Sequence, residues 1–208
     1  GVPARAGMRK FDHAATLDTG GVPVVALAGS CMEAGKTAAA CAMISRMRHR
    51  GLTIDAFKAT GVSLRRDILA MEDSGARRTA IFTDFGVVTT TAKNGPALTR
   101  TMLTEMAAGK PDVIVFELGD GILGAYGVEA ILDAPDIRKA LTAVVLSAND
   151  PVAAWGGVKI LRERFGLPDD RYGALLVYAA LSTLLPSLTR TFSLDASDVG
   201  AALAQRVA

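Results

Sequence analysis

Residues 22–37 read Val-Pro-Val-Val-Ala-Leu-Ala-Gly-Ser-Cys-Met-Glu-Ala-Gly-Lys-Thr, and this stretch decides the fold. Its first part, Val22–Ala28, is a continuous apolar run, which is typical of a parallel strand buried on both faces. After a short loop, Lys36–Arg50 places apolar residues at helical spacing, and Gly51 is a common helix end. We therefore predict a strand, a tight loop and an amphipathic helix in succession.

The same alternation of strand and helix continues along the chain. The predicted strands are Thr53–Phe57, Thr79–Phe82, Asp112–Phe116, Ala143–Leu146, Ala174–Tyr178 and an edge strand at Thr191–Leu194. The predicted helices are Leu64–Asp73, Pro96–Ala108, Val128–Leu141 with a break near Pro135, Pro151–Phe165 and Ala196–Val207. Such alternation implies an α/β fold with three layers, α/β/α, around a mostly parallel central sheet. Ligands of such sheets bind beyond the carboxyl ends of the strands.

Length and composition suggest one globular domain preceded by a short linker. The chain has 208 residues, of which 50% are apolar and 21% are charged. We predict the domain at residues 22–208. Residues 1–21 have little periodicity, and we interpret them as a linker or the remnant of an upstream segment. The first residue is Gly1 rather than Met, which is expected of a processed chain or of a piece of a longer protein.

Charge and cysteine content disfavour several classes of function. A net charge of +2 gives no reason to expect nucleic acid or an anionic membrane as a partner. The two cysteines, Cys31 and Cys41, form no CxxC pair, so neither a disulfide scaffold nor a zinc site is expected. No apolar run reaches the roughly 18–20 residues of a membrane helix. A cytoplasmic location is the natural expectation.

The loop between the first strand and helix has the context of a P-loop, which binds phosphate groups. Backbone N–H groups and the positive end of the helix dipole would face the phosphates, Lys36 would supply a cation and act in catalysis, and Thr37 would offer a hydroxyl to Mg²⁺. The predicted nucleotide-binding residues are Gly29, Ser30, Cys31, Met32, Glu33, Ala34, Gly35, Lys36 and Thr37, with position 38, an alanine (Ala38) that offers only its backbone amide. We expect ATP with Mg²⁺. GTP is less favoured because the Asn-Lys-x-Asp motif that recognises guanine is absent.

The number of residues between the two glycines of this loop is similar to that in a known group of P-loop proteins. Five residues separate Gly29 from Gly35, whereas the common P-loop has about four. The longer loop resembles that of dethiobiotin synthetase, and it is similar to loops of cobyrinic acid a,c-diamide synthase and of uncharacterised P-loop proteins, some with an added N-terminal domain. The resemblance covers most of the chain from Val22 onward. The signature lysine of the MinD-like branch is absent, which argues against a nucleotide-sandwich dimer of that kind.

Charged residues at two further strand ends are candidates for the same site. Glu117 ends the apolar run Val-Ile-Val-Phe, where a carboxylate can bind Mg²⁺ directly or through water. The resemblance implies the same role, because dethiobiotin synthetase has a metal-holding Glu-Gly pair there. Asp120 lies between two glycines and is either part of the site or a turn residue. Lys58 resembles the lysine that faces phosphate and substrate in that family, so we treat it as a second catalytic candidate. The proline that follows that lysine in the family is missing here.

Two aspartates compete for a second position at the metal. The resemblance implies a metal-binding Asp about ten residues beyond the lysine, which favours Asp67 over its rival Asp84. Arg65 and Arg66 either attract an anionic substrate or belong to an exposed face. The hydroxyl-rich stretch Thr89–Thr91 can line a substrate cleft.

The remaining candidates concern the base and the thiol. Asn149 lies where related proteins read the base, although Asn149-Asp150-Pro is equally a helix start. Trp155 either flanks the base or belongs to the core. Cys31 can make binding sensitive to thiol modification. His13 and His49 are isolated, and we assign them no role.

Three functions compete on this basis. The resemblance implies an ATP-dependent ligase in which an acceptor, such as a carboxylic acid, is phosphorylated and then attacked by an amine. The second hypothesis is a nucleotide-driven switch or assembly factor that hydrolyses ATP or GTP. The third is an N-acyltransferase whose loop holds the phosphates of coenzyme A. The resemblance also favours a homodimer, because a neighbouring subunit often completes the substrate cleft in this superfamily.

Overall fold

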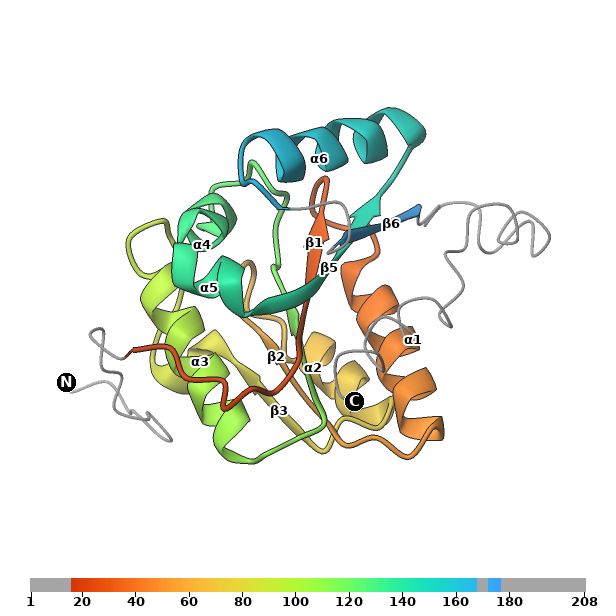
Figure 1. Ribbon diagram of the computed structural model, residues 1–208, viewed down its shortest axis with the longest axis vertical. Coiled ribbons are helices and arrows are strands. Elements are labelled where there is room, and N and C mark those ends of the chain that lie inside the picture. The colour runs from red at the N-terminus through yellow and green to blue at the C-terminus, as the bar shows by residue number, and fades with distance from the viewer. Residues whose placement is uncertain (1–15, 168–171, 177–208) are drawn as a thin grey trace.

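A single parallel sheet forms the centre of the molecule (Figure 1). The structure, a computed structural model, describes residues 16–167 and 172–176. In these residues six strands lie in the order β3-β2-β4-β1-β5-β6, and every neighbouring pair is parallel. The strands are β1 (Val24–Gly29), β2 (Ile54–Lys58), β3 (Arg78–Ile81), β4 (Val113–Glu117), β5 (Leu141–Ala148) and β6 (Tyr172–Leu176).

Helices cover both faces of this sheet and complete three layers, as the sequence predicts (Figure 1). They are α1 (Lys36–His49), α2 (Arg65–Asp73), α3 (Gly95–Ala108), α4 (Val128–Asp133), α5 (Pro135–Ala140) and α6 (Pro151–Glu163), with a 3-10 turn η1 (Phe82–Phe85). Ile44 of α1 packs on one face with Val25 and Leu27 of β1. Leu98 of α3 and Ile131 of α4 pack on the other face. The α/β/α prediction is therefore confirmed.

The predicted break near Pro135 is confirmed and separates α4 from α5. Pro135 is the first residue of α5, where its missing N–H costs no helical hydrogen bond. Ala134 before it is extended, with φ −72° and ψ 113°, because the proline ring disfavours helical backbone in the preceding residue.

Strand ends differ from the prediction in a consistent way. The predicted strands end at Ala28, Phe57 and Phe116, whereas β1, β2 and β4 each include one residue more. The added residues are Gly29, Lys58 and Glu117. A glycine or a charged residue is a poor strand former by propensity, yet the ladder continues through it because the neighbouring strand continues.

Other boundaries shift by one to three residues for local reasons. Strand β1 begins at Val24 rather than Val22, because Pro23 has no N–H to donate to the ladder. Strand β5 is longer than Ala143–Leu146. Phe82 begins the 3-10 turn instead of ending β3. The edge strand predicted at Thr191–Leu194 and the helix predicted at Ala196–Val207 lie outside the described residues.

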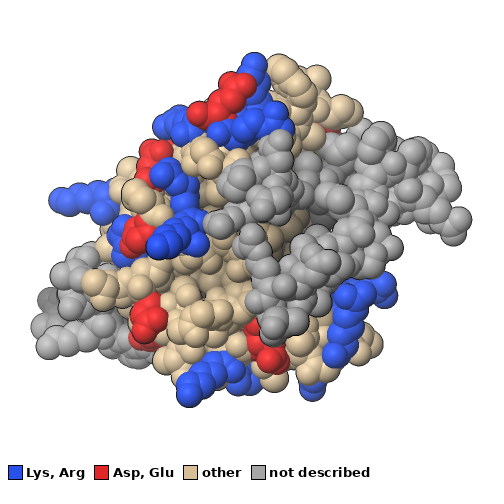
Figure 2. Space-filling view, in the orientation of Figure 1, with Lys and Arg blue, Asp and Glu red and all other residues tan. Residues whose placement is uncertain are grey.

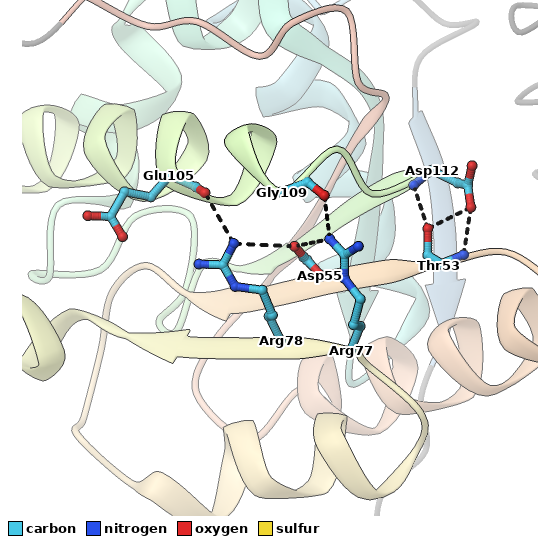
Figure 3. A network of polar contacts seen from close by, with 7 residues as sticks. All are labelled: Thr53, Asp55, Arg77, Arg78, Glu105, Gly109 and Asp112. Atoms are coloured by element: carbon cyan, nitrogen blue, oxygen red, sulfur yellow. Dashed lines mark hydrogen bonds and ion pairs between the residues drawn. The ribbon is translucent and has the colours of Figure 1, made fainter.

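A network of charged residues ties the sheet to its helices at the amino ends of the strands (Figure 3). Asp55 of β2 is fully buried, and Arg77 donates to its two carboxylate oxygens at 2.9 and 2.8 Å. Arg77 also donates to the carbonyl oxygen of Gly109 at the end of α3, at 2.9 Å. Arg78 lies 3.9 Å from the same carboxylate. The guanidinium groups neutralise the buried charge at the edge opposite the phosphate loop.

Surface charges of both signs are interspersed on the face that Figure 2 shows. Lys159 pairs with Glu163 on α6 at 3.9 Å, and Arg164 pairs with Glu129 of α4. This mixture agrees with the small net charge of +2. Among the described residues, no helix combines the length and the apolar character needed to cross a membrane.

Candidate functional site

The loop between β1 and α1 is shaped by backbone geometry and held from two sides. Gly35 has φ 89°, a left-handed conformation that glycine adopts without strain, and it directly precedes α1. Ser30 donates its backbone N–H to the carbonyl oxygen of Ser147 in β5, at 2.9 Å. Ile122, in the loop after β4, donates to the carbonyl oxygen of Gly29 at 2.8 Å. The loop is therefore clamped between two neighbouring segments of the sheet edge.

Lys36 folds back over this loop. Its side chain is 4% exposed, and Nζ donates to the carbonyl oxygen of Cys31 at 2.8 Å. The side chain crosses Gly29 so closely that a Cβ atom there would lie 2.8 Å from Nζ. Burial lowers the pKa of Lys36, and the nearby Glu117 partly opposes this shift. A buried ammonium at the amino end of a helix is an environment in which an anion gains from binding.

Thr37 and Glu117 meet next to that lysine. Thr37 Oγ1 donates to Glu117 Oε2 at 2.8 Å, and Glu117 is 3% exposed. Burial raises the pKa of Glu117, opposed most strongly by the positive charge of Lys58. Glu117 reaches this position because it pairs with Leu27 of β1 and with Lys58 of β2 in the sheet register.

The chemistry of this oxygen pair fits Mg²⁺. A hydroxyl and a carboxylate are hard oxygen donors, and Mg²⁺ commonly takes one or two protein ligands and completes its shell with phosphate oxygens and water. In the described part of the chain, no three His, Cys, Asp or Glu side chains converge in a way that could hold a metal by themselves. Thr37 and Glu117 are therefore suited to hold Mg²⁺ together with phosphate oxygens and water.

Lys58 and Asp67 form a buried ion pair beside Glu117. Lys58 ends β2 and is 4% exposed, and its Nζ contacts Asp67 Oδ2 in the first turn of α2. The other carboxylate oxygen of Asp67 lies 3.6 Å from Nε of Arg66. The structure thus brings together Lys36, Thr37, Glu117, Lys58 and Asp67 from four separate elements.

Asp84 does not join this group. Its Oδ2 accepts the backbone N–H of Ile81 at 3.0 Å, and its Oδ1 accepts from Arg65 at 3.0 Å. These bonds fix the start of the 3-10 turn. Arg65 and Arg66 have exposed side chains, 63% and 78%, as expected of a solvated face.

Asp120 acts within its own loop. It is buried and accepts from the backbone N–H groups of Gly121 at 2.7 Å and Tyr126 at 3.4 Å. These bonds give Asp120 a turn role, and it also lies close enough to Lys36 for its negative charge to raise the pKa of that lysine.

Sequence reasoning missed the contact that joins the loops after β2 and β4. Thr60 Oγ1 accepts the backbone N–H of Gly119 at 2.8 Å, and a Cβ atom on Gly119 would overlap the Thr60 carbonyl oxygen. Thr90, from the hydroxyl-rich stretch Thr89–Thr91, is buried and accepts the N–H of Gly61 at 3.2 Å. The paired glycines at strand ends were the one available signal, since glycine often marks a close backbone approach.

The candidates for base recognition lie at the end of β5. Asn149 is exposed and its Nδ2 donates to Cys31 Sγ in the phosphate loop, at 3.2 Å. Asp150 accepts the N–H of Ala153 at 2.9 Å, which is the helix-start role. Trp155 is 67% exposed and is not a core residue.

The structure describes both cysteines and one of the two histidines. Cys31 and Cys41 are free thiols. His49 is exposed and its Nδ1 lies 2.6 Å from the carbonyl oxygen of Ser45. His13 lies outside the described residues.

Comparisons with known proteins support the fold. No family model matches the sequence, and no curated protein matches it either. The structure resembles the signal recognition particle receptor FtsY from Elizabethkingia anophelis, with TM-score 0.53 and 11% identity over 93% of this chain and 67% of that chain. It also resembles chloroplast FtsY from Physcomitrella patens, with TM-score 0.54 and 13% identity over 94% of this chain and 69% of that chain.

Sheet order, phosphate loop and structural likeness together define a P-loop NTPase fold. At such low identity the likeness establishes the fold alone. The closer resemblance to dethiobiotin synthetase stays a prediction from the sequence.

Proposed function

We propose that this protein binds a nucleoside triphosphate with Mg²⁺ and transfers or hydrolyses its terminal phosphoryl group. One observation carries the proposal. Thr37 Oγ1 and Glu117 Oε2 lie 2.8 Å apart next to the buried amine of Lys36, at the amino end of α1. Hydroxyl, carboxylate and ammonium in this arrangement are the groups that phosphoryl transfer needs for positioning and charge neutralisation.

Each residue has a defined task in this proposal. The backbone amides of the loop beyond Ser30, whose own N–H is bonded to Ser147, and the ammonium of Lys36 hold the phosphate oxygens. Thr37 and Glu117 hold Mg²⁺, which supplies positive charge to the phosphate oxygens when it is bound. Lys58 lies beside Glu117 in the neighbouring strand and offers a second ammonium toward the terminal phosphoryl group.

Two reaction types share this machinery. By analogy of fold, the similar structures favour a nucleotide-driven assembly factor, because one of them is a receptor of the signal recognition particle. The ligase reading is favoured by Lys58, since a buried lysine at this strand end is what the resemblance to dethiobiotin synthetase implies. We place the nucleotide-driven switch first and the ligase second.

A ligand screen by thermal unfolding tests the proposal. The protein is heated with Mg²⁺ and ATP, with Mg²⁺ and GTP, and with acetyl-CoA. A ligand that binds only the folded state raises Tm by mass action, and we expect a rise with a triphosphate that is absent in Lys36→Ala. A rise with acetyl-CoA alone would replace the proposal with an acyltransferase.

Phosphate release then separates the two reaction types. Hydrolysis that increases on addition of a partner protein supports the switch. Hydrolysis that requires a small carboxylic acid supports the ligase. Absence of Mg²⁺-dependent phosphate release under both conditions would contradict phosphoryl transfer.

A further inference from the structure

Lys58 and Asp67 form a buried ion pair next to the candidate functional site. The two side chains are 5% and 12% exposed and come from the end of β2 and the first turn of α2. Lys58 pairs in register with Glu117, the residue that contacts Thr37. The ion pair therefore adjoins the groups that the proposed function assigns to Mg²⁺ and phosphate.

Both carboxylate oxygens of Asp67 already face cations. Oδ2 contacts the ammonium of Lys58, and Oδ1 lies 3.6 Å from the guanidinium of Arg66. If Asp67 bound a divalent cation instead, Lys58 would lose its partner while a double positive charge approached it. A buried cation without a partner is strongly unfavourable, so this exchange opposes metal binding at Asp67.

Glu117 also lies near the positive charges of Lys58 and Lys36, but the side chain that it contacts is an uncharged one. Its Oε2 accepts a hydrogen bond from the neutral hydroxyl of Thr37 at 2.8 Å. Asp67 and Glu117 do not converge with a third acidic, His or Cys side chain in the residues that the structure describes. The two acids thus have separate tasks, one toward the metal and one toward a lysine.

We propose that Asp67 is a positioning residue, which holds the Lys58 ammonium toward the terminal phosphoryl group, and that it is not a Mg²⁺ ligand. The inference rests on the proposed function. It replaces the role that the sequence resemblance implies for Asp67. Its consequence is that the effect of Asp67 on catalysis passes through Lys58.

Nucleotide affinity with and without metal is the first test. The β,γ-imido analogues of ATP and GTP are titrated in Mg²⁺ and in EDTA, and the ratio of the two Kd values gives the metal-dependent gain. We expect Asp67→Asn to keep this gain within about twofold and Glu117→Gln to lose most of it. Asp73→Asn, on the exposed end of the same helix, is the matched control and is expected to behave as the wild type.

A double variant keeps the test valid if Asp67→Asn alone fails to fold. Lys58→Met combined with Asp67→Asn removes both charges and leaves no buried ion without a partner. The double variant is expected to retain the metal-dependent gain. Loss of that gain in Asp67→Asn or in the double variant, to the extent seen in Glu117→Gln, would overturn the inference and leave the proposed function intact.

The second test measures kcat and KM for nucleotide hydrolysis. Lys58→Met and Asp67→Asn are each expected to lower kcat about a hundredfold with a much smaller change in KM. The kcat of the double variant is expected to be no lower than that of Lys58→Met. Both substitutions remove the same effect, which is the action of the Lys58 ammonium on the terminal phosphoryl group. If the two substitutions lowered kcat independently, so that the double variant lost the product of the two single effects, the inference would be overturned. A wild-type protein that binds neither analogue would refute the proposed function itself, and this inference with it.

Discussion

Gly29 and Lys36 depend on each other at the smallest scale. The lysine side chain crosses the Cα of Gly29 on its way to the carbonyl oxygen of Cys31. Only a residue without a Cβ leaves this path open. The glycine is therefore needed for the position of the ammonium, whereas its backbone is ordinary ladder backbone at the end of β1.

Gly29→Ala is expected to weaken triphosphate binding by about tenfold or more. The new Cβ would lie 2.8 Å from Nζ and 2.9 Å from Cδ of Lys36. The Lys36 side chain can yield, and the Cys31 carbonyl oxygen, 3.1 Å from the new Cβ, would have to shift only slightly, so the fold should survive while the ammonium leaves its place. Calorimetric Kd values and Tm measure the two effects separately. Gly156→Ala, whose Cβ would meet no atom within 4 Å, is the control. Unchanged affinity in Gly29→Ala would contradict the assigned path of Lys36.

Some site residues could be predicted from the sequence and others could not, for a physical reason. Lys36, Thr37 and Glu117 stand at the ends of recognisable elements, so the sequence predicts that they lie at the same edge of the parallel sheet. Thr60 and Gly119 meet across 59 positions of the chain through a backbone contact. Nothing local in the sequence signals that contact. The pairing of Asp67 with Lys58 rather than with a metal likewise depends on how α2 packs.

The loops after β2 and β4 are interlocked at the element scale. Thr60 holds Gly119 by a hydrogen bond, and Gly121 of the same loop lies against the phosphate loop, since a Cβ there would be 2.7 Å from the Ser30 carbonyl oxygen. The position of Glu117 is thereby fixed from both neighbouring strands.

Gly119→Ala should destabilise the fold by about 1–3 kcal/mol, because its Cβ would overlap the Thr60 backbone, which cannot yield as a side chain tip can. The free energy of unfolding from denaturant titration measures this loss. A variant as stable as the wild type would show that the two loops are not packed against each other as described.

A second element-scale contact links the starts of β2 and β4 (Figure 3). The backbone N–H and the hydroxyl of Thr53 both donate to Asp112 Oδ2 at 2.7 Å. Hydrogen bonds from the Thr53 side chain and backbone lower the pKa of Asp112 below its ordinary value of 3.8. Because the folded pKa is the lower one, this carboxylate stabilises the fold above its unfolded pKa, and the contribution is lost as pH falls through the folded pKa.

Asp112→Asn should therefore lower stability at pH 7 and have little effect in strong acid. The loss at pH 7 is expected to be no more than about 1 kcal/mol, because the group is exposed and water screens it. Unfolding titrations of both proteins between neutral and acidic pH measure the difference. A difference that grows toward low pH would contradict the assignment.

Among the described residues, the buried charged groups lie at the two edges of one sheet. At the amino ends, arginines neutralise the buried Asp55 and tie the layers together. At the carboxyl ends, the ammonium groups of Lys36 and Lys58 face the carboxylates of Glu117 and Asp67. Asp55 and the pair Lys58–Asp67 have their partners within the fold, whereas the ammonium of Lys36, which donates to the Cys31 carbonyl oxygen, is suited to receive an anion.

The three-layer fold follows from the alternation of apolar strands and amphipathic helices, and the sequence therefore predicts it. The strand order β3-β2-β4-β1-β5-β6 does not follow in the same way. That order places β4 between β2 and β1, and it depends on packing between residues far apart in the chain. This placement is what brings Glu117 between Lys58 and Thr37.

Calorimetric titration of the wild-type protein and Lys36→Ala with MgATP and MgGTP tests the central claim most directly. We predict that the wild type binds at least one of these nucleotides and that the variant binds it at least about tenfold more weakly, with an unchanged Tm in the absence of ligand. Equal affinity of the two proteins, or no binding to the wild type, would contradict a phosphate site at residues 29–37.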